Sequence, residues 1–339
     1  MNSFGRIFRV NIFGESHGES AGINIDGCPA GLPLSAEDFL EDIERRKGGT
    51  QKGTTPRKED DLPIFKSGIF NGKTTGAPIT ILFENKNTRS GDYEKQRAVP
   101  RPGHADFVAH AKFGGHEDFR GGGHFSGRLT VCLVAAGVIA KKLLTLSPLS
   151  TGGEGPGVRA TILEIGGETD LDKGLQKAID NKDSIGGIVE CRVSGLPVGL
   201  GEPFFDSAES VISHAVFAIP AIRGIEFGTG FAAAKMFGVD HNDVIEDKTG
   251  RTKTNHAGGV VGGITNGNEL VFRIAVKPTS STPKEQQTLN WETGAVESFS
   301  VKGRHDLCIA LRVPVVLEAV TALVLVDLLM LEHHIKRIL

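Results

Sequence analysis

The chain is poor in tryptophan, tyrosine and cysteine, and it has no excess of positive charge. Its 339 residues include one tryptophan, one tyrosine and four cysteines. Lysine and arginine total 38 against 41 aspartates and glutamates, so the formal net charge is −3. Proteins that bind nucleic acid usually present a strong basic field, so this balance predicts no nucleic-acid partner. Any polyanionic ligand must instead be held by local arginines.

The four cysteines also argue against a disulfide framework and a metal centre. They are widely separated and show no metal-ligand spacing, at Cys28, Cys132, Cys191 and Cys308. We therefore expect reduced, partly buried thiols in a cytosolic protein, with no metal site.

No segment has the pattern of a signal peptide or a membrane span. Residues 1–6 lack an apolar run, which predicts a cytoplasmic location. The most apolar stretch, 313–331, contains Glu318 and Asp327, so we expect a buried core helix and no membrane partner.

Two common nucleotide-binding signatures are missing as well. The glycine-rich stretch 254–267 is not placed between a strand and a helix as a dinucleotide fingerprint would be. No glycine loop is followed by the lysine and hydroxyl residue of a P-loop. A Rossmann or P-loop site is therefore disfavoured.

Glycine, by contrast, is abundant, with 45 residues, and the segment Arg101–Arg128 concentrates it with ionisable groups. This segment holds three arginines, four histidines and the consecutive glycines 121–123. Glycines let a ligand approach the backbone closely, and arginines bind phosphate or carboxylate through planar charged forks. Histidines exchange protons near neutral pH. The segment predicts a site that binds a small polyanion and performs acid–base chemistry.

Periodicity along the chain predicts a mixed α and β fold. We expect strands at 8–13, 21–25, 158–165, 187–193 and 270–276, and helices after Ser35 and at 127–146, 208–217 and 314–335. Ser35 with Asp38 forms a capping-box pattern. The polar stretch 47–61 is expected to be a mobile loop near the ligand. Residues 147–158 resemble a hinge, and the second half broadly echoes the first, so we consider an internal duplication.

Several other residues are candidates for chemistry, and each has a structural alternative. His17 lies in a glycine-flanked turn after a strand, where it could face a cleft or only bond to backbone. His104 follows a rigid turn and could serve the ligand or be an ordinary loop histidine. Asp306 could act as a base or pair with Arg304 to anchor the last helix. Lys277–Ser281 could contact a phosphate or a flavin edge, or be a polar turn.

These blocks together resemble the chorismate synthase family in order and spacing. The matching strings are Gly14–Gly18, Arg101–Asp106, Arg120–Arg128, Asn255–Gly263, Lys277–Ser281 and Gly303–Asp306. The resemblance implies a lyase that eliminates phosphate from 5-enolpyruvylshikimate-3-phosphate in a 1,4-sense to give chorismate, in the shikimate pathway. It implies reduced FMN as cofactor and NADPH as a candidate reductant. It further implies an α+β fold, a β-α-β sandwich of antiparallel sheets enclosed by helices, in one catalytic domain over 1–339 that forms a homotetramer.

The resemblance also assigns roles to individual residues. His17 would protonate the departing phosphate, His104 would serve the reduced flavin, and Asp306 would mediate proton removal near flavin N5. The substrate would be bound by Arg46, Arg101, Arg120 and Arg128. Flavin contacts would come from His124, Phe125, Ser126, Ala221, Gly262, Lys277, Pro278, Thr279, Ser280, Ser281 and Arg304. NADP contacts would come from Arg46 and Lys52.

The chain departs from the usual family pattern at three places. His124-Phe125-Ser126-Gly127-Arg128-Leu129-Thr130 stands where Arg-Ser-Ser-Ala-Arg-Glu-Thr is common. Lys52 replaces a frequent arginine, and Leu307 replaces a usual proline. The first change removes one permanent positive charge and one hydroxyl from an expected flavin contact.

Two alternatives remain open from the sequence. One is a non-catalytic anion- or flavin-binding protein, against which the presence of both histidines and Asp306 argues. The other is an NAD(P)-linked oxidoreductase, against which the missing dinucleotide fingerprint argues.

Overall fold

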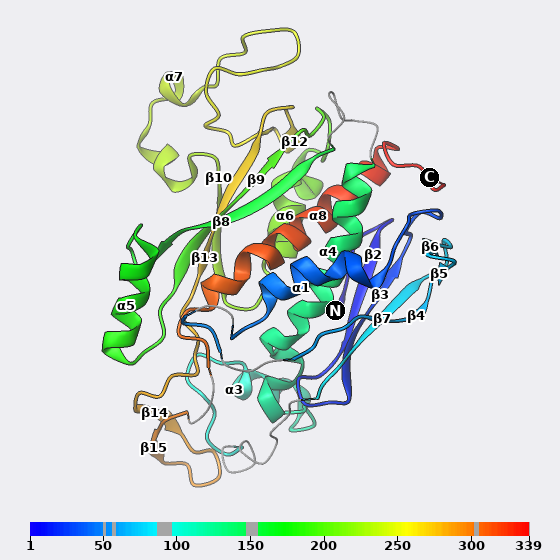
Figure 1. Cartoon of the computed structure of the whole chain (residues 1–339). Coiled ribbons are helices and arrows are strands. Elements are labelled where there is room, and N and C mark those ends of the chain that lie inside the picture. Colours follow the sequence, from blue (N-terminus) through cyan, green and yellow to red (C-terminus); the bar gives the residue numbers. More distant parts are fainter. Residues whose placement is uncertain (50–51, 56–58, 87–96, 147–154, 302–304, 339) are drawn as a thin grey trace.

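Two antiparallel β-sheets pack against opposite sides of a pair of long helices in the computed structural model (Figure 1). The structure describes residues 1–49, 52–55, 59–86, 97–146, 155–301 and 305–338. One cluster of buried apolar side chains runs from the first sheet through the helices to the second sheet.

The first sheet is built from the N-terminal quarter of the chain. Its order is β1 (Ser3–Phe4), β2 (Arg9–Gly14), β3 (Ser20–Asp26), β7 (Ile79–Glu84) and β4 (Ile64–Ser67), with every neighbouring pair antiparallel. Ile23 and Ile25 of β3 face Ile81 and Ile79 of β7, and all four side chains are fully buried.

The second sheet is built from residues 157–276. Its order is β10 (Ile222–Phe227), β13 (Leu270–Val276), β9 (Gly187–Ser194) and β8 (Gly157–Ile165), again antiparallel throughout.

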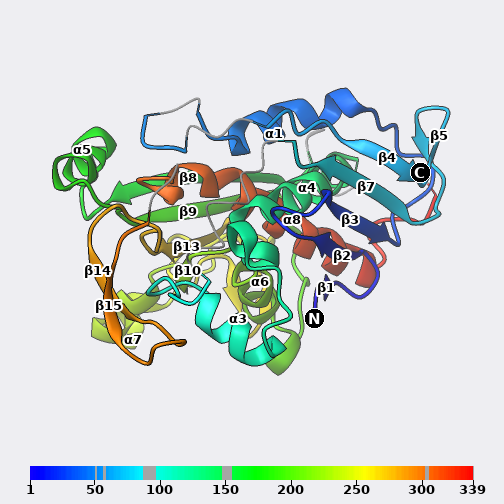
Figure 2. The same ribbon diagram turned by 90° about the horizontal axis from the view of Figure 1, so that it is seen from below.

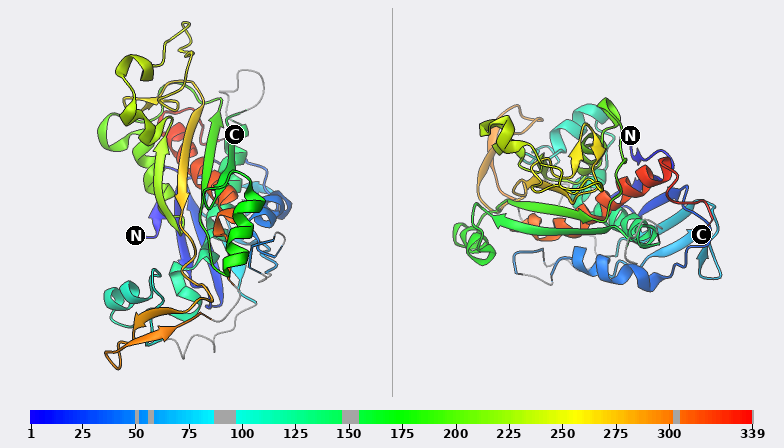
Figure 3. Two further views of the ribbon diagram at one scale, coloured as in Figure 1. Left: turned by 90° about the vertical axis from the view of Figure 1, so that its left-hand side faces the viewer. Right: turned by 90° about the horizontal axis from the view of Figure 1, so that it is seen from above.

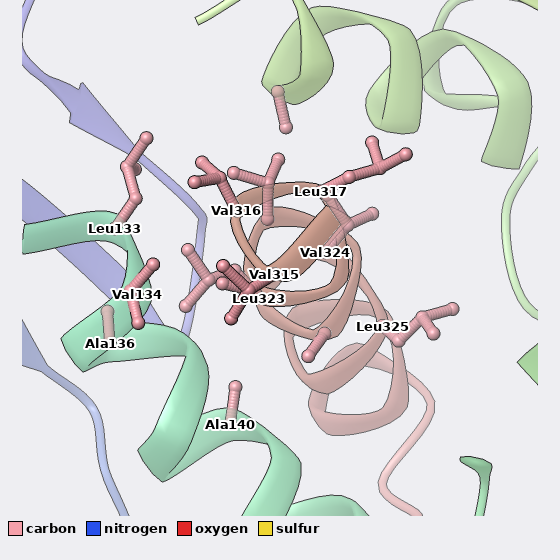
Figure 4. Close-up of a cluster of buried hydrophobic side chains, with 14 of the residues drawn as sticks. Leu133, Val134, Ala136, Ala140, Val315, Val316, Leu317, Leu323, Val324 and Leu325 are labelled. Atoms are coloured by element: carbon pink, nitrogen blue, oxygen red, sulfur yellow. The ribbon is translucent and has the colours of Figure 1, made fainter. Parts of the chain in front are cut away.

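The middle layer consists of α4 (Thr130–Thr145) and α8 (Val313–Leu331). Figures 2 and 3 show both helices between the two sheets, with α4 against β3 and α8 against β8 and β9. Both helices are apolar around most of their circumference, as helices buried on all sides must be. Gly137 of α4 lies so close to Ala319 that an added Cβ would be 2.2 Å from the Ala319 Cβ. Leu133, Val134 and Val316 pack in this layer (Figure 4).

The remaining helices lie around this core. α6 (Ala208–Val216) packs on α8, α5 (Leu171–Asn181) packs on β8, and α1 (Leu40–Arg46) packs on α4 and α8. The other elements are α3 (Asp106–Phe113), α7 (Gly238–His241) and the hairpins β5 (Ile69–Phe70) with β6 (Lys73–Thr74), β11 (Val260–Val261) with β12 (Ile264–Thr265), and β14 (Gln286–Leu289) with β15 (Val296–Phe299). Short 3₁₀ segments lie at Ala36–Phe39 (η1), Arg120–Phe125 (η2), Gly127–Leu129 (η3), Phe204–Asp206 (η4), Gly230–Lys235 (η5) and Ile309–Arg312 (η6).

The structure confirms the α+β class, the predicted strands and the Ser35 capping box, in which the Ser35 N–H donates to Asp38 Oδ2 at 2.8 Å. The two longest helices form the middle layer between the sheets. Two details differ. The last helix ends at Leu331, not at 335, where exposed polar residues replace the apolar run. Helices α3 and α5 and strands β7 and β10 were not predicted.

The last helix also resolves the question that its composition raised. Residues 309–331 are long and apolar enough to cross a membrane by composition, yet this segment is almost entirely buried inside the protein. Its two carboxylates have hydrogen-bond partners, since Arg45 donates to Glu318 and the Phe8 N–H donates to Asp327. This confirms the expected core helix.

Candidate functional site

A cavity of about 800 Å³ gathers segments from the whole length of the chain. Most of the predicted site residues line it: His17, Arg46, Arg101, His104, His124, Phe125, Ser126, Arg128, Ala221, Lys277, Thr279, Ser280, Ser281 and Asp306. These residues come from connecting loops, from the end of α1 and from the segments that lead into the two middle helices. The fold therefore brings together blocks that are distant in sequence.

The glycine run forms the wall against which two histidines pack. Gly121, Gly122 and Gly123 have φ angles of 61°, 83° and 53°, so all three occupy the left-handed region that favours glycine. A Cβ on Gly121 would lie 2.5 Å from His17 Cδ2, and one on Gly122 would lie 3.2 Å from His104 Cε1. The absence of side chains at 121 and 122 therefore allows both imidazoles to approach the backbone of η2.

His17 is held in a tight turn after β2. Its side chain is buried, and Asn85 fixes the turn because its amide donates to the carbonyls of Glu15 and Gly18, each at 2.9 Å. The pKa of Asp118 is lowered mainly by its hydrogen bond from Arg120, and His17 contributes to this lowering. His17 thus has a carboxylate nearby and lines the cavity rather than only serving its own turn.

His104 belongs to a compact triad with Asp106 and Arg101. His104 Nδ1 lies 2.6 Å from Asp106 Oδ1, and Arg101 Nε and Nη2 donate to the same carboxylate at 2.7 and 2.8 Å. Burial would raise the pKa of Asp106, but the hydrogen bonds from Arg101 and His104 outweigh burial and lower the pKa overall. Asp106 is therefore an ionised carboxylate that orients both the imidazole and the guanidinium.

Two of the predicted arginines meet at a carboxylate that sequence reasoning missed. Asp61 pairs with Arg46 Nη2 at 2.7 Å and also with Arg128, and its side chain is fully buried. Burial and the positive charge of Arg312 lower the pKa of Arg46 to about 10, while Asp61 opposes that shift. Asp61 has a φ of 51°, an unusual value for a non-glycine residue. Only the tertiary structure shows that Arg46 and Arg128 share Asp61 as a partner.

Asp306 has a partner that the sequence did not indicate. Arg312 Nη1 donates to its Oδ2 at 3.0 Å, and the Thr55 N–H donates to its Oδ1 at 2.8 Å. Arg304, the expected partner, lies outside the described residues. Arg312 lines the cavity and also donates to the Arg46 carbonyl at 2.8 Å, so it is a further site residue that the sequence did not indicate. Its position one residue before the last helix was the only available signal.

The segment 277–281 supplies a row of hydroxyls beside these charges. Lys277 Nζ donates to Ser280 Oγ at 2.9 Å, and Arg101 Nη1 donates to Ser281 Oγ at 3.2 Å. Thr279 Oγ1 donates to the Asp306 carbonyl at 3.0 Å. Burial, with a smaller effect from Arg223, lowers the pKa of Lys277. This segment is therefore joined to both the His104 triad and the backbone at Asp306.

The block that departs from the family pattern also faces the cavity. His124 Nδ1 lies 2.8 Å from the Gly14 carbonyl, and Ser126 Oγ accepts from the Arg128 N–H at 3.2 Å. Phe125 lines the cavity and is 42% exposed. Ala221 has a φ of 75°, and its carbonyl accepts from the Lys277 N–H at 2.9 Å.

Four predicted residues do not line this cavity. Arg120 forms an ion pair with Asp118 at 2.8 Å and is half-exposed. Lys52 is exposed and donates to Gln176. Gly262 lies at the tip of the β11–β12 hairpin. Pro278 packs beside Gly186. Among the described residues no group of His, Cys, Asp and Glu has the arrangement of a metal site, and all four cysteines are buried and free.

Part of the cavity wall is apolar. This part is formed by side chains of α4, α6 and α8 and the loop after α6, among them Leu133, Ala215, Ile219, Val316, Val320 and Leu323. A cavity lined by both cationic and apolar side chains suits a ligand that combines a planar apolar ring system with phosphate or carboxylate groups. Its imidazoles can move protons.

Comparison with known proteins agrees with this arrangement. Residues 8–330 match the family model described as chorismate synthase. A chorismate synthase of Chitinophaga pinensis is 71% identical over 100% of this chain and 99% of its own length. One from Methanocaldococcus jannaschii is 42% identical over 97% of this chain and 96% of its own. A crystal structure of chorismate synthase superposes with a TM-score of 0.73 at 25% identity, covering 97% of this chain and 93% of that one.

Proposed function

Because this chain belongs to the chorismate synthase family, we propose that it converts 5-enolpyruvylshikimate-3-phosphate to chorismate with reduced FMN as cofactor. The reaction is a carbon–oxygen lyase step of the shikimate pathway, in which a ring C–H bond and the C–O bond to phosphate break without net redox change. The observation that carries the proposal is the single cavity that gathers His17, His104 and Asp306 with Arg46, Arg101 and Arg128.

The chemistry of the cavity fits FMN. Its apolar side chains can accept a fused aromatic ring, and Lys277, three hydroxyls and the His124–Ser126 turn are available to phosphate and to the ring's polar edge. The volume of about 800 Å³ is within the range of cofactor and small-molecule sites. Ser and Thr hydroxyls with one lysine are groups that can bind a flavin phosphate. When bound, the reduced flavin would lend electron density transiently to the substrate.

The protein's own residues would then hold charges and move protons. Arg46, Arg101 and Arg128 would bind the phosphate and the carboxylates of the substrate, with Arg120 as a further candidate. Each charge-assisted hydrogen bond contributes roughly 1.5–3 kcal/mol, so a few of them can hold such a ligand on a mildly acidic protein.

Three groups would transfer protons. His17, against the glycine run, would protonate the departing phosphate. His104, oriented by Asp106, would donate a proton or hydrogen bond toward the reduced flavin. Asp306, held by Arg312 and the Thr55 N–H, would accept a proton removed from the substrate ring.

Other assignments that the family resemblance implies remain part of the proposal. Gly262, Pro278 and Arg304 would contact FMN, and Arg46 with Lys52 would bind NADP if the enzyme reduces its own flavin with NADPH. We further propose one catalytic domain over 1–339 with an internal duplication, a cytoplasmic location, a homotetramer, and no nucleic-acid or membrane partner.

The decisive experiment is an anaerobic assay with chemically reduced FMN. We expect chorismate and phosphate to form in equal amounts, with no oxidation of FMN per turnover. Full turnover by flavin-free protein would refute the cofactor assignment. Stoichiometric consumption of NADPH with substrate would instead indicate an oxidoreductase, and flavin binding without turnover would indicate a non-catalytic binder.

A further inference from the structure

One imidazole of the cavity is not used by the mechanism above. His305 lines the cavity next to Asp306, and its Nε2 is buried and has no hydrogen-bond partner in the part of the chain that the structure describes. Buried polar atoms nearly always have a partner, so an unpaired one at a ligand cavity points to a group that the ligand supplies.

The charges around His305 determine what kind of partner it can take. Burial and the positive charge of Arg101 lower its pKa, and Asp306 only partly opposes them. The imidazole is therefore neutral at neutral pH, and it carries one N–H donor and one acceptor nitrogen. A phosphate or carboxylate would favour the protonated ring, whereas a neutral carbonyl or ring nitrogen suits the neutral form.

The position of His305 indicates which side of the cavity that partner occupies. Arg101, whose positive charge lowers the pKa of His305, donates a hydrogen bond to Ser281. Thr279 donates to the backbone carbonyl of Asp306, the residue after His305. His305 thus belongs to the side of the cavity formed by 277–281, the segment suited to a flavin edge.

We propose that His305 Nε2 forms a direct hydrogen bond with a neutral polar atom on the edge of the bound flavin ring. The inference rests on the proposed function and adds a cofactor contact to it. His305 then helps to fix the ring relative to Asp306, because the two residues are consecutive in the chain.

Binding of FMN, without substrate or turnover, tests this contact. His305→Gln places an amide near the position of Nε2, whereas His305→Asn places one near Nδ1. His116→Gln is the matched control, because His116 is exposed and does not line the cavity. Dissociation constants would be measured by flavin fluorescence and by calorimetry, for oxidised and for anaerobically reduced FMN, together with the melting temperature of each variant.

We expect the Asn variant to bind FMN about tenfold more weakly, because it loses one neutral hydrogen bond to the flavin. The Gln variant and the control should stay within about twofold of the wild type, since the Gln amide restores the bond.

Two results would overturn the inference while the proposed function stands. One is wild-type affinity in the Asn variant, and the other is equal weakening by Asn and Gln with a lowered melting temperature, which would indicate a packing role. Where the Asn variant keeps wild-type FMN affinity, a rise in substrate KM in a separate turnover assay would assign the contact to the substrate. Failure of the wild type itself to bind FMN would instead refute the proposed function, and the inference with it.

Discussion

At the residue scale, the site depends on how neighbouring charges orient the groups that transfer protons. Asp106 is ionised and accepts from Arg101, and His104 Nδ1 lies 2.6 Å from the same carboxylate. The opposite side of the ring, Cε1 and Nε2, faces Gly122, where an added Cβ would lie 3.2 and 3.3 Å from these two atoms. One ring nitrogen is thus held in place, and the other is available at the glycine wall.

We predict that His17→Ala and His104→Ala each lower kcat by about 10²–10⁴-fold, the usual contribution of a general acid or base. Both side chains border the cavity rather than the apolar core, so the folded state should persist. Steady-state assays with reduced FMN would measure kcat, and thermal melts would report folding. His116→Ala, at an exposed position, is the control. Near-wild-type kcat in both variants across neutral pH would contradict the proton-transfer roles.

We predict that Asp306→Asn lowers kcat at least about 100-fold while FMN affinity changes little. The substitution keeps the size of the side chain and its acceptor for the Thr55 N–H but removes the base and the ion pair with Arg312. Single-turnover rates and FMN titration would separate the two effects. Asp327→Asn is the structural control, because Asp327 accepts three backbone N–H groups of residues 6–8 and does not line the cavity. That control should lose stability and keep its turnover per folded molecule. If Asp306→Asn also lost stability but kept its turnover per folded molecule, Asp306 would have no part in the mechanism.

At the element scale, the 3₁₀ segment η2 and the turn after β2 form one unit. The Ser16 N–H donates to the Gly123 carbonyl at 3.1 Å, which joins the His17 turn to the glycine run. Because these elements come from positions more than 100 residues apart, the placement of His17 depends on the shape of η2 rather than on its own turn alone.

We predict that Gly121→Ala lowers kcat about as strongly as the loss of His17. The added Cβ would lie 2.5–2.6 Å from two atoms of the His17 ring, so the imidazole must move. Gly167→Ala is a matched control: Gly167 also has a positive φ, 80°, but a Cβ there meets nothing within 4 Å. It should lose about 1 kcal/mol of stability from backbone strain and keep normal kcat. Equal kcat in the two variants would show that turnover does not depend on the close contact between Gly121 and the His17 ring.

At the scale of the whole molecule, a buried carboxylate ties four elements together. Glu318 of α8 accepts from Arg45 of α1 at 2.8 Å, from Lys141 of α4 at 2.8 Å, and from the Ala160 N–H of β8 at 3.1 Å. Burial would raise the pKa of Glu318, but Arg45 and Lys141 outweigh it and lower that pKa below its ordinary value of 4.5. The middle layer and the second sheet are therefore joined by charge as well as by apolar packing.

We predict that Glu318→Gln destabilises the protein by about 3 kcal/mol at neutral pH, as expected when one partner of a buried ion pair is removed. Since the folded pKa is below the unfolded one, the contribution of the carboxylate is fully present above pH 4.5 and is lost as pH falls toward the folded pKa. Denaturant unfolding at several pH values would show the difference between wild type and variant shrinking below that point. A difference that is constant or grows on acidification would contradict this linkage.

We predict that the protein sediments as a homotetramer at micromolar concentration. Large aromatic side chains stay exposed on the single chain: Phe204, Phe205, Phe231 and Phe237 are each at least 80% exposed. Surfaces of this kind usually mark protein contacts. Sedimentation velocity would measure the mass, and a stable monomer would contradict the prediction.

The sequence by itself determined the local structure and the inventory of the site. Alternating and helical apolar patterns depend on near neighbours, so β2, β3, α4 and most of α8 were predictable, as was the capping box at Ser35. The motif blocks indicated which loops carry chemistry, because histidines, arginines and glycines cluster within each block.

Only the tertiary structure decided which of these groups meet. The Thr55 N–H and Asp306 are 251 residues apart in sequence, and Arg45 and Glu318 are 273 apart. Asp61 joins Arg46 to Arg128 although no local pattern marks it, and Asp306 pairs with Arg312. Such partners are selected when two sheets close on the middle helices and desolvate the charges between them, since each buried charge must then find an opposite charge or a hydrogen bond. That requirement acts between distant segments, so local periodicity carries no record of it.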